Sequence, residues 1–570
     1  MAEEVWMLQT KKADFKQIGA RFRIDPVTAR IIRNRGIEGE AAIDRYLNGT
    51  LYDLYDPMLL KDMEHAVSIL CEAVDTGKKI RIVGDYDIDG VCSTYILLQA
   101  FERLGSDVDF EIPDRIKDGY GINESIIEQA HADGVEVILT CDNGISAFHQ
   151  VELAKKYGMT VVITDHHEVP LDGEKEKIPP ADAVIDPKQA DCPYPFPEIC
   201  GAVVAYKLVQ VLYARRGVPQ MEWLDLLEFA AIATVGDVMK LQDENRILVK
   251  YGLKKMAQTK NLGLRRLAEK SNLDLGAITA YHIGFVIGPC LNAGGRLKTA
   301  KEALALLRAQ SEEEAERLAE ELKELNDTRK DMTEQGTEAA KLQVESWYQK
   351  DKVLVVFLPE CHESLAGIIA GRLREYYQKP AIVLTRGEEA VKGSGRSIDE
   401  YHMFKKLTEV SDLLLKFGGH PLAAGLSLEE KNIDEFRRRL NENAGLTEED
   451  FKAKVWIDVP MPVGYVTERL VRELSCLEPF GQGNEKPLFA EKSLRIRASR
   501  VLGRNRNVVK MTLEETDGHA IEALYFGDGT AFEEERAGRR EIDVVYYPDI
   551  NEYNGRKTLQ AVIRRYKFRG

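Results

Sequence analysis

The chain has 570 residues, of which 44% are hydrophobic and 30% are charged. This length exceeds what one hydrophobic core usually organises, and it predicts roughly three or four globular domains. The formal net charge of −16 excludes a uniformly basic protein, yet residues 491–570 hold 16 Lys or Arg against 13 Asp or Glu. Charge therefore permits nucleic-acid binding by a local surface without predicting it.

The sequence gives no sign of membrane insertion, secretion or a disulfide framework. It contains no apolar run of about 18 residues, and its first residues lack the basic and then apolar pattern of a secretory signal. The eight cysteines are scattered without a Cys-x-x-Cys pair, which argues against a zinc ribbon and suits a reducing compartment. We therefore expect a cytoplasmic protein without a membrane segment.

The first elements in chain order are a short helical lead-in over residues 1–50 and an α/β domain over 51–310. Between about 79 and 240, short β-branched apolar runs alternate with amphipathic helical segments, as expected for strands buried on both faces of a parallel sheet. The strands are expected at 80–83, 135–140, 160–164 and 183–185, with helices such as 93–104 and 124–132 between them. This order predicts a doubly wound sheet, whose ligand sites lie beyond the carboxyl ends of the strands.

Three further parts follow along the chain. Residues 311–347 carry a long polar helical pattern, which we interpret as a connecting helix rather than a partner-binding coiled coil. Residues 348–450 predict a second, smaller α/β domain, with strands at 353–357 and 381–384 around a helix at 365–377. Residues 451–570 comprise a linker and then strands alone, at 508–513, 520–526, 543–547 and 557–565. This last pattern predicts a small β-barrel, for which the OB type is the leading candidate.

An acidic loop follows the first predicted strand. Asp85, Asp87 and Asp89 alternate with other residues there, and three carboxylates so close together would repel one another without a cation. Hard divalent ions such as Mg²⁺ or Mn²⁺ prefer oxygen ligands of this kind. The loop is not a calcium-binding EF-hand, because position twelve is Ile96 instead of Glu. The alternative interpretation is an acidic turn that caps the following helix.

Three more polar motifs follow further along the chain. Asp142 comes directly after a predicted strand in Cys-Asp-Asn-Gly, although such a motif is often a simple turn. His166 and His167 follow the next strand, and imidazole nitrogens suit a transition metal, although adjacent histidines are often incidental. Asp237 ends an apolar helical stretch, where it could be only a helix-end charge. Each motif is weak alone, but their coincidence at consecutive strand ends favours a metal centre.

These motifs resemble the DHH phosphoesterases, a superfamily named after the string Asp165-His166-His167, over nearly the whole chain. More narrowly, several other segments resemble the RecJ family of exonucleases. These segments are 113–115 (PDR), 118–121 (DGYG), 200–208 (CGAVVAYKL), 288–297 (GPCLNAGGRL), 393–397 (GSGRS), 417–425 (FGGHPLAAG) and 478–484 (EPFGQGN). The resemblance implies a parallel-sheet DHH domain, a DHH-associated α/β domain that binds substrate and an OB-fold that binds nucleic acid.

The resemblance also implies a site with two divalent cations, manganese or magnesium. Asp85 and Asp87 would hold the first ion, and Asp89, His166 and Asp237 the second. Asp142 would bridge the two ions, and His167 would act at the scissile phosphate or orient a ligand. The candidate binding site for the DNA 5′ end consists of Asn292, Arg296, Ser394, Arg396 and His420, and Arg115 is a further expected substrate-binding residue.

The implied activity is a single-strand-specific 5′→3′ exonuclease that releases 5′-mononucleotides in DNA repair and recombination. Single-stranded DNA is the expected partner, with single-strand-binding protein and a helicase as further candidates. The barrel would guide the strand through its basic residues Arg495, Arg497, Arg500, Arg504, Arg506 and Lys510. Two alternatives are a DHH phosphatase acting on short oligonucleotides or cyclic dinucleotides, and a catalytically inactive scaffold. The extra barrel argues against the first, and the intact acidic and histidine positions argue against the second.

The chain departs from the family pattern at three places. Several DHH relatives carry a histidine where this chain has Val83, and Asp85 is expected to substitute for it. The expected Trp-His-x-Gly of the second α/β domain reads Cys361-His362-Glu363-Ser364 here. The barrel also lacks a histidine near Val508.

Overall fold

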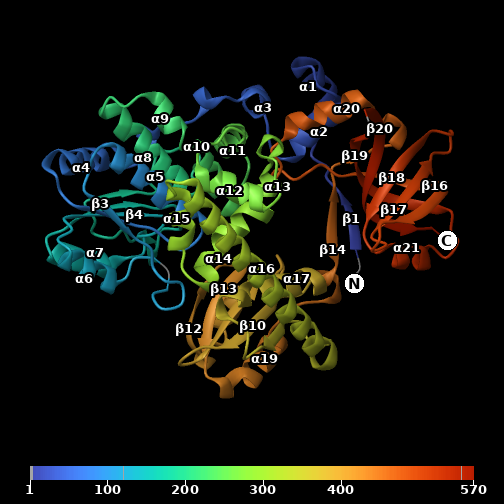
Figure 1. The fold of residues 1–570 in the computed structure, drawn as a ribbon. Coiled ribbons are helices and arrows are strands. Elements are labelled where there is room, and N and C mark those ends of the chain that lie inside the picture. Colours follow the sequence, from blue (N-terminus) through green and yellow to red (C-terminus); the bar gives the residue numbers. More distant parts are fainter. Residues whose placement is uncertain (1–3, 120, 554, 570) are drawn as a thin grey trace. The chain divides into compact units, whose positions relative to one another are not determined.

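The computed structural model describes residues 4–119, 121–553 and 555–569 and divides into two compact units. The first unit comprises Met1–Glu4, Tyr55–Met239 and Tyr251–Ala453, and the second comprises Val5–Leu54, Lys240–Lys250 and Lys454–Gly570. Figure 1 labels the helices and strands of both units. Within the described ranges, no helix combines the length and the apolarity needed to cross a membrane.

The first unit begins with a five-stranded parallel sheet in the order β3-β2-β4-β5-β8. Its strands are β2 (Ile80–Val83), β3 (Val108–Glu111), β4 (Val137–Cys141), β5 (Thr160–Thr164) and β8 (Ala183–Ile185). The predicted parallel sheet is thus confirmed. The edge strand β3 was not predicted, because its residues are only partly buried and its Val-Asp-Phe-Glu pattern lacks the continuous apolar run of the others.

Helices cover both faces of this sheet (Figure 1). On one face, α6 (Glu124–Ala132) and α7 (Phe148–Lys156) pack residues such as Ile126 and Val151 against Ile138 and Ile163 of the strands. On the other face lie α4 (Met63–Thr76), α5 (Ile88–Arg103) and α8 (Gly201–Arg215). α5 and α8 are almost entirely buried. Burial on both faces explains why the strands read as continuous apolar runs.

A helical layer continues the first unit. It contains α10 (Leu227–Gly236), α12 (Leu262–Lys270), α13 (Ala280–His282), a π-helical turn (Ile283–Ile287), α14 (Gly288–Leu297) and α15 (Lys301–Arg308). The long helix α16 (Glu312–Gln343) follows and packs against α12, α14, α15 and α17. It begins at Ser311, whose side chain accepts a hydrogen bond from the Glu314 amide, a standard N-cap. Buried residues such as Leu318 and Leu322 show that one side of this helix is part of the core.

The second sheet of the first unit has the order β12-β13-β11-β10-β9. Its strands are β9 (Leu354–Phe357), β10 (Ala381–Arg386), β11 (Val391–Arg396), β12 (Leu414–Gly419) and β13 (Ala423–Leu428). Only β9 and β10 are parallel, and the other pairs are antiparallel. α17 (Ala366–Tyr377) packs on one face, and α19 (Ile433–Glu442) contributes to the core on the other. The predicted smaller α/β domain is therefore present.

The second unit is built around a closed barrel. Strands β16 (Phe489–Leu502), β17 (Val508–Glu514), β18 (Ala520–Phe526), β20 (Arg556–Phe568) and β19 (Glu541–Tyr553) pair in that order. An additional pairing between β16 and β19 closes the ring. A five-stranded barrel is the expected form of an OB-fold, which confirms that prediction.

Residues near the amino end belong to the same unit. Ile31 and Ile32 of α2 (Pro26–Asn34) and Tyr46 of α3 (Glu40–Asn48) join one core with barrel residues such as Phe489. Arg246 is almost fully buried there. It donates hydrogen bonds to the carbonyls of Tyr46 (3.1 Å), Leu477 (2.8 Å) and Cys476 (2.8 Å). Three separated segments of the chain therefore build this unit.

Candidate metal centre

The parallel sheet brings the predicted acidic and histidine motifs to one edge. Asp85 comes two residues after β2, Asp142 directly after β4 and His166 two residues after β5. Since the strands are parallel, their carboxyl ends lie on the same side of the sheet. Asp237 reaches this edge from a different direction, as the residue that follows the last turn of α10.

The acidic loop both starts a helix and contributes to the site. Asp87 is the N-cap of α5, and its carboxylate accepts hydrogen bonds from the amides of Asp89 (2.9 Å) and Gly90 (3.1 Å). The capping interpretation of the acidic turn is therefore correct for Asp87, which also belongs to a candidate ligand group. Asp89 accepts from the amides of Gly201 and Ala202, both at 2.7 Å. The amino end of α8 thus stabilises negative charge at Asp89.

Close approach at the centre depends on Gly201. A Cβ added there would lie 2.7 Å from the Cβ of Asp142, which is shorter than real contacts allow. Asn143 fixes the loop that carries Asp142, because its amide nitrogen donates to the carbonyls of Val83 (3.0 Å) and Cys141 (2.9 Å). Asn143 belongs to the Cys-Asp-Asn-Gly motif, but its positioning role was not predicted.

The side chains form two ligand groups that share no residue but lie in contact with each other. In each group, one ligand atom per residue lies within 4.8 Å of the others. One group is Asp85, Asp87 and Asp142, and the other is Asp89, His166 and Asp237. His166 Nε2 connects them, since it lies 3.1 Å from Asp142 Oδ1, 3.5 Å from Asp89 Oδ2 and 3.8 Å from Asp237 Oδ2. A third group joins Asp142 and His166 with His167.

Electrostatics favour cations at this centre. Burial and then repulsion from Asp87 raise the pKa of Asp85 to about 8. Burial and then Asp89 raise the pKa of Asp237 to about 8, and burial with the neighbouring aspartates raises the pKa of Asp142 well above its ordinary value. Carboxylates buried this closely need positive charge to remain ionised at neutral pH. The donor set of carboxylate oxygens and one imidazole fits Mn²⁺ or Mg²⁺.

The three residues of the Asp-His-His string have different surroundings. The fully buried Asp165 accepts hydrogen bonds from the His166 amide (2.7 Å) and the Ile145 amide (2.9 Å). Its Oδ1 also lies 2.7 Å from His167 Nδ1. Burial alone would lower the pKa of His167, but the hydrogen bond and the charge of Asp165 raise it to about 9. Asp165 therefore orients His167, a role that the sequence motif did not reveal.

The predicted phosphate-binding arginines lie near one another in the first unit. Burial and then the charge of Arg115 lower the pKa of Arg296 to about 10, and Arg396 adds to this effect. The guanidinium of Arg115 stacks 4.2 Å from the ring centroid of Tyr86 in the acidic loop. Arg296 donates to the Ser364 carbonyl at 2.9 Å, so it links the two α/β parts. Mutually repelling, partly buried guanidinium groups favour a bound anion.

Ser394 and Arg396 face the beginning of α17. Arg396 Nη1 donates to Ser394 Oγ at 3.3 Å and to the Gly395 carbonyl at 2.8 Å. A Cβ added at Gly367, in the first turn of α17, would lie 2.9 Å from both Arg396 Nη2 and Ser394 Oγ. Because Gly367 has no side chain, Arg396 and Ser394 can approach the amino end of α17 closely. The amino ends of helices favour the binding of anions.

The other two predicted phosphate-binding residues are less closely tied to the arginines. Asn292 lies on α14, one helical turn before Arg296, and is partly buried. His420 is exposed after β12, and its charge interacts with Glu168, the neighbour of His167. Tyr120, in the 118–121 segment that resembles the RecJ family, lies outside the described residues.

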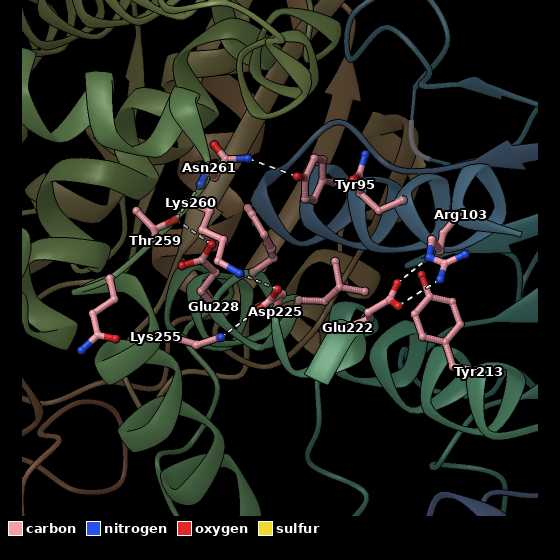
Figure 2. A pocket seen from close by; sticks show the side chains of 14 residues that line it. Tyr95, Arg103, Tyr213, Glu222, Asp225, Glu228, Lys255, Thr259, Lys260 and Asn261 are labelled. Atoms are coloured by element: carbon pink, nitrogen blue, oxygen red, sulfur yellow. Dashed lines mark hydrogen bonds and ion pairs between the residues drawn. The ribbon is translucent and has the colours of Figure 1, made fainter. Parts of the chain in front are cut away.

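A separate cavity of about 310 Å³ occupies another part of the first unit (Figure 2). Its ionic groups pair with one another, Arg103 with Glu222 and Lys255 with Asp225. Glu228 also lines it and accepts a hydrogen bond from Thr259 Oγ1 at 2.7 Å. None of the residues predicted for the metal centre lines this cavity.

Three models of known protein families together match most of the chain. Residues 79–234 match the model of the DHH family, N-terminal domain, and residues 350–445 match the DHHA1 domain. Residues 457–565 match the RecJ OB domain. These three matches coincide, in that order along the chain, with the parallel-sheet domain, the smaller α/β domain and the barrel.

Relatives and solved structures agree with these matches. The chain is 36% identical to the single-stranded-DNA-specific exonuclease RecJ of Bacillus subtilis, over 98% of this chain and 70% of that protein. It is 34% identical to the Escherichia coli protein of the same name, over 95% of each. The crystal structure of RecJ in complex with Mn²⁺ from Thermus thermophilus superimposes with a TM-score of 0.84 at 28% identity, covering 99% of this chain and 80% of that one. The Mg²⁺ complex gives a TM-score of 0.78 at 27% identity, covering 99% and 78%. The chain belongs to the RecJ family of the DHH superfamily.

Proposed function

We propose that this protein is a metal-dependent exonuclease that degrades single-stranded DNA from its 5′ end and releases 5′-mononucleotides. The observation that carries the proposal is that two sets of candidate metal ligands lie in contact through His166 and Asp142. The chain that contains them belongs to the RecJ family. The relatives at 32–36% identity that span most of the chain are single-stranded-DNA-specific exonucleases by name. DNA repair and recombination are the processes that would use this activity.

Each of the two ligand groups would hold one cation. Asp85 and Asp87 would hold one ion, Asp89, His166 and Asp237 the other, and Asp142 would contact both. Bound Mn²⁺ or Mg²⁺ would supply water activation and neutralise charge on the phosphate during phosphodiester hydrolysis. One related RecJ crystal structure is a complex with Mn²⁺ and another is a complex with Mg²⁺.

The protein's own groups would orient the substrate at this centre. Asp165 holds Nδ1 of His167, so the imidazole ring keeps a fixed direction. We assign this ring to the scissile phosphate as a hydrogen-bond donor, where it would stabilise negative charge as the bond breaks.

Recognition of the 5′ end would fall to the arginine cluster. Arg115, Arg296 and Arg396 supply forked donors for a phosphate, together with Ser394 and the amino end of α17. Asn292 and His420 would complete this surface. A terminal phosphate held here would set the direction of digestion, because the bond that reaches the metal centre is then the first one from the 5′ end.

The barrel would bind the unpaired strand beyond the site. Arg495, Arg500, Arg504 and Arg506 are candidates for backbone contacts, whereas Arg497 and Lys510 already pair with Glu514 and Glu522. Because the enzyme needs unpaired strands, we also propose a helicase and single-strand-binding protein as partners. All eight cysteines are free, which supports a cytoplasmic location.

A digest of end-labelled DNA tests the proposal directly. The 5′-labelled single strand should release labelled mononucleotide at once, whereas the 3′-labelled strand should shorten progressively and the duplex should resist. Rapid release from the 3′ label would contradict the direction. Hydrolysis of dinucleotides alone would favour the phosphatase alternative, and inactivity on every substrate with either metal would favour a scaffold.

A further inference from the structure

Two large aromatic side chains stand exposed on the first unit. Tyr281 is 63% exposed and Phe285 is 67% exposed. Their rings stack with centroids 4.7 Å apart and planes 27° from parallel. Aromatic residues of this size usually bury most of their surface. Two of them exposed side by side mark a surface that interacts with a ligand or another macromolecule.

The exposure does not come from a loose segment. The pair spans α13 and the π-helical turn Ile283–Ile287 that leads into α14. Ile283 and Ile287, on the opposite side of the turn, are fully buried. Thr279 and His282 form a capping box that fixes the start of α13. The helix is therefore anchored by its apolar side and holds both rings outward.

This helix packs directly against residues that flank the metal centre. A Cβ added at Gly288 would lie 3.2 Å from Ile88 Cδ1, and one added at Gly236 would lie 2.6 Å from Ile88 Cγ2. Ile88 lies between Asp87 and Asp89, and Gly236 directly precedes Asp237. A Cβ at Gly284, next to Phe285, would lie 3.6 Å from Val235. The aromatic pair therefore lies beside the elements that carry the metal ligands.

An exposed valine directly follows the candidate ligand Asp237. Val238, directly after Asp237, is 65% exposed and has a positive φ of 57°. A β-branched residue is strained in that backbone region and persists there only where the surroundings enforce it. Such strain clusters at functional sites, and this one places an apolar side chain where α10 ends, next to the candidate ligand Asp237.

The same helical segment leads to the phosphate-binding residues. Asn292 and Arg296 lie on α14, which continues from the turn that bears Phe285. Eleven residues separate Phe285 from Arg296, about 16 Å along a helix, which corresponds to a few nucleotides of an extended strand. A strand with its terminal phosphate at Arg296 would therefore have its first bases within reach of the rings. Unpaired bases stack on aromatic side chains irrespective of their sequence.

We propose that Tyr281 and Phe285 form a stacking platform for an unpaired base next to the metal centre, with Val238 at its apolar edge. This inference rests on the proposed function and deepens it. The platform would favour single strands because a paired base cannot leave its stack to occupy it. Neither ring would take part in the chemistry, so the two residues position the substrate.

The test combines binding and digestion. Oligonucleotides carry the fluorescent base 2-aminopurine at one of the first six positions, and binding is followed in chelator so that no hydrolysis occurs. Stacking on a ring should quench the fluorescence at one or two positions with the unaltered protein and not with the Tyr281→Ala, Phe285→Ala double variant. Digestion by the double variant should fall about tenfold in kcat/KM. An abasic site at the quenched position should slow the unaltered protein by a similar factor and the double variant hardly at all.

A matched control uses Trp347, which is 72% exposed in the same unit. Trp347→Ala should change neither the quenching nor the digestion. Quenching that the unaltered protein shows and the double variant lacks, together with no digestion by the unaltered protein, would uphold the platform and reject the proposed function. Normal digestion by the double variant, with unchanged quenching, would overturn the platform and leave the proposed function intact. Equal losses by the double variant on intact and abasic strands would also overturn it.

Discussion

Nε2 of His166 lies 3.1 Å from Oδ1 of Asp142, and this contact joins the two ligand groups into one centre. Asp142 belongs to the first group, and a third group places it with His166, which is itself a member of the second group. A change at Asp142 should therefore affect both cations, whereas a change at Asp237 should affect one.

Replacing Asp142 with Ala should reduce turnover to below a few percent of the unaltered protein. The physical reason is that a carboxylate contacting both cations would position each of them for phosphodiester hydrolysis. Turnover is measured on a labelled single strand, and bound manganese is counted in the same samples. Asp237→Ala is the comparison and should retain more bound metal. A folded Asp142→Ala variant with near-normal turnover would refute the bridging role.

Chelation should abolish digestion, and manganese should restore it at least as well as magnesium. The imidazole of His166 favours a softer ion than a purely oxygen-lined site would. Activity is titrated with each metal after dialysis against chelator. Calcium restoring activity while manganese remained inert would contradict the donor set described above.

Arg396→Ala should reduce kcat/KM about ten- to a hundredfold on strands with a 5′ phosphate. A charge-assisted hydrogen bond is worth about 1.5–3 kcal/mol, and each 1.36 kcal/mol corresponds to a factor of ten in rate. The loss should be smaller on strands with a 5′ hydroxyl, where the contact is already partly absent. Arg386→Ala provides a control, because Arg386 is an exposed arginine of the same sheet that pairs with Glu430. Equal losses on both kinds of end would exclude terminal phosphate recognition by Arg396.

Glu228→Gln should remove part of the pH dependence of stability. Burial raises the pKa of Glu228 from an ordinary value near 4.5 to about 7, so the folded state binds a proton that the unfolded chain releases earlier. Its favourable contribution is complete below about pH 4.5 and is lost as the pH rises through 7. This corresponds to at most about 3 kcal/mol between pH 5 and 8. Urea unfolding at both pH values measures it, with Glu222→Gln as control, since Glu222 is a half-buried carboxylate of the same cavity that pairs with Arg103 (Figure 2). An identical pH dependence in the unaltered protein and Glu228→Gln would disprove the assignment.

Much of the first sheet could be predicted from the sequence because its strands are buried on both faces. Continuous apolar runs locate β2, β4, β5 and β8 within a few residues, and the motifs at their ends locate the acidic cluster. The edge strand β3 gives no such signal, since its side chains are only half buried. The ligand roles within the cluster stay predictions.

Contacts that depend on distant segments could not be predicted. Asp165 acts on His167 through a hydrogen bond that only the folded loop creates. Arg246 meets Tyr46 and Leu477 across about 200 positions in the chain, and no local pattern encodes that meeting. The lead-in over residues 1–50 likewise reads as a separate helical piece until its isoleucines are found in the barrel core.

The shared core of the second unit has a consequence for protein engineering. Its barrel depends on Ile31, Ile32 and Tyr46 from one segment and on Arg246 from another, so the barrel is not a portable module. A chimera that exchanged only residues 454–570 with a relative would place foreign strands against the original helices α2 and α3. Successful grafts should require residues 5–54 and 240–250 to be transferred together with the barrel, and the yield of folded protein from such grafts would show whether the three segments fold as one block.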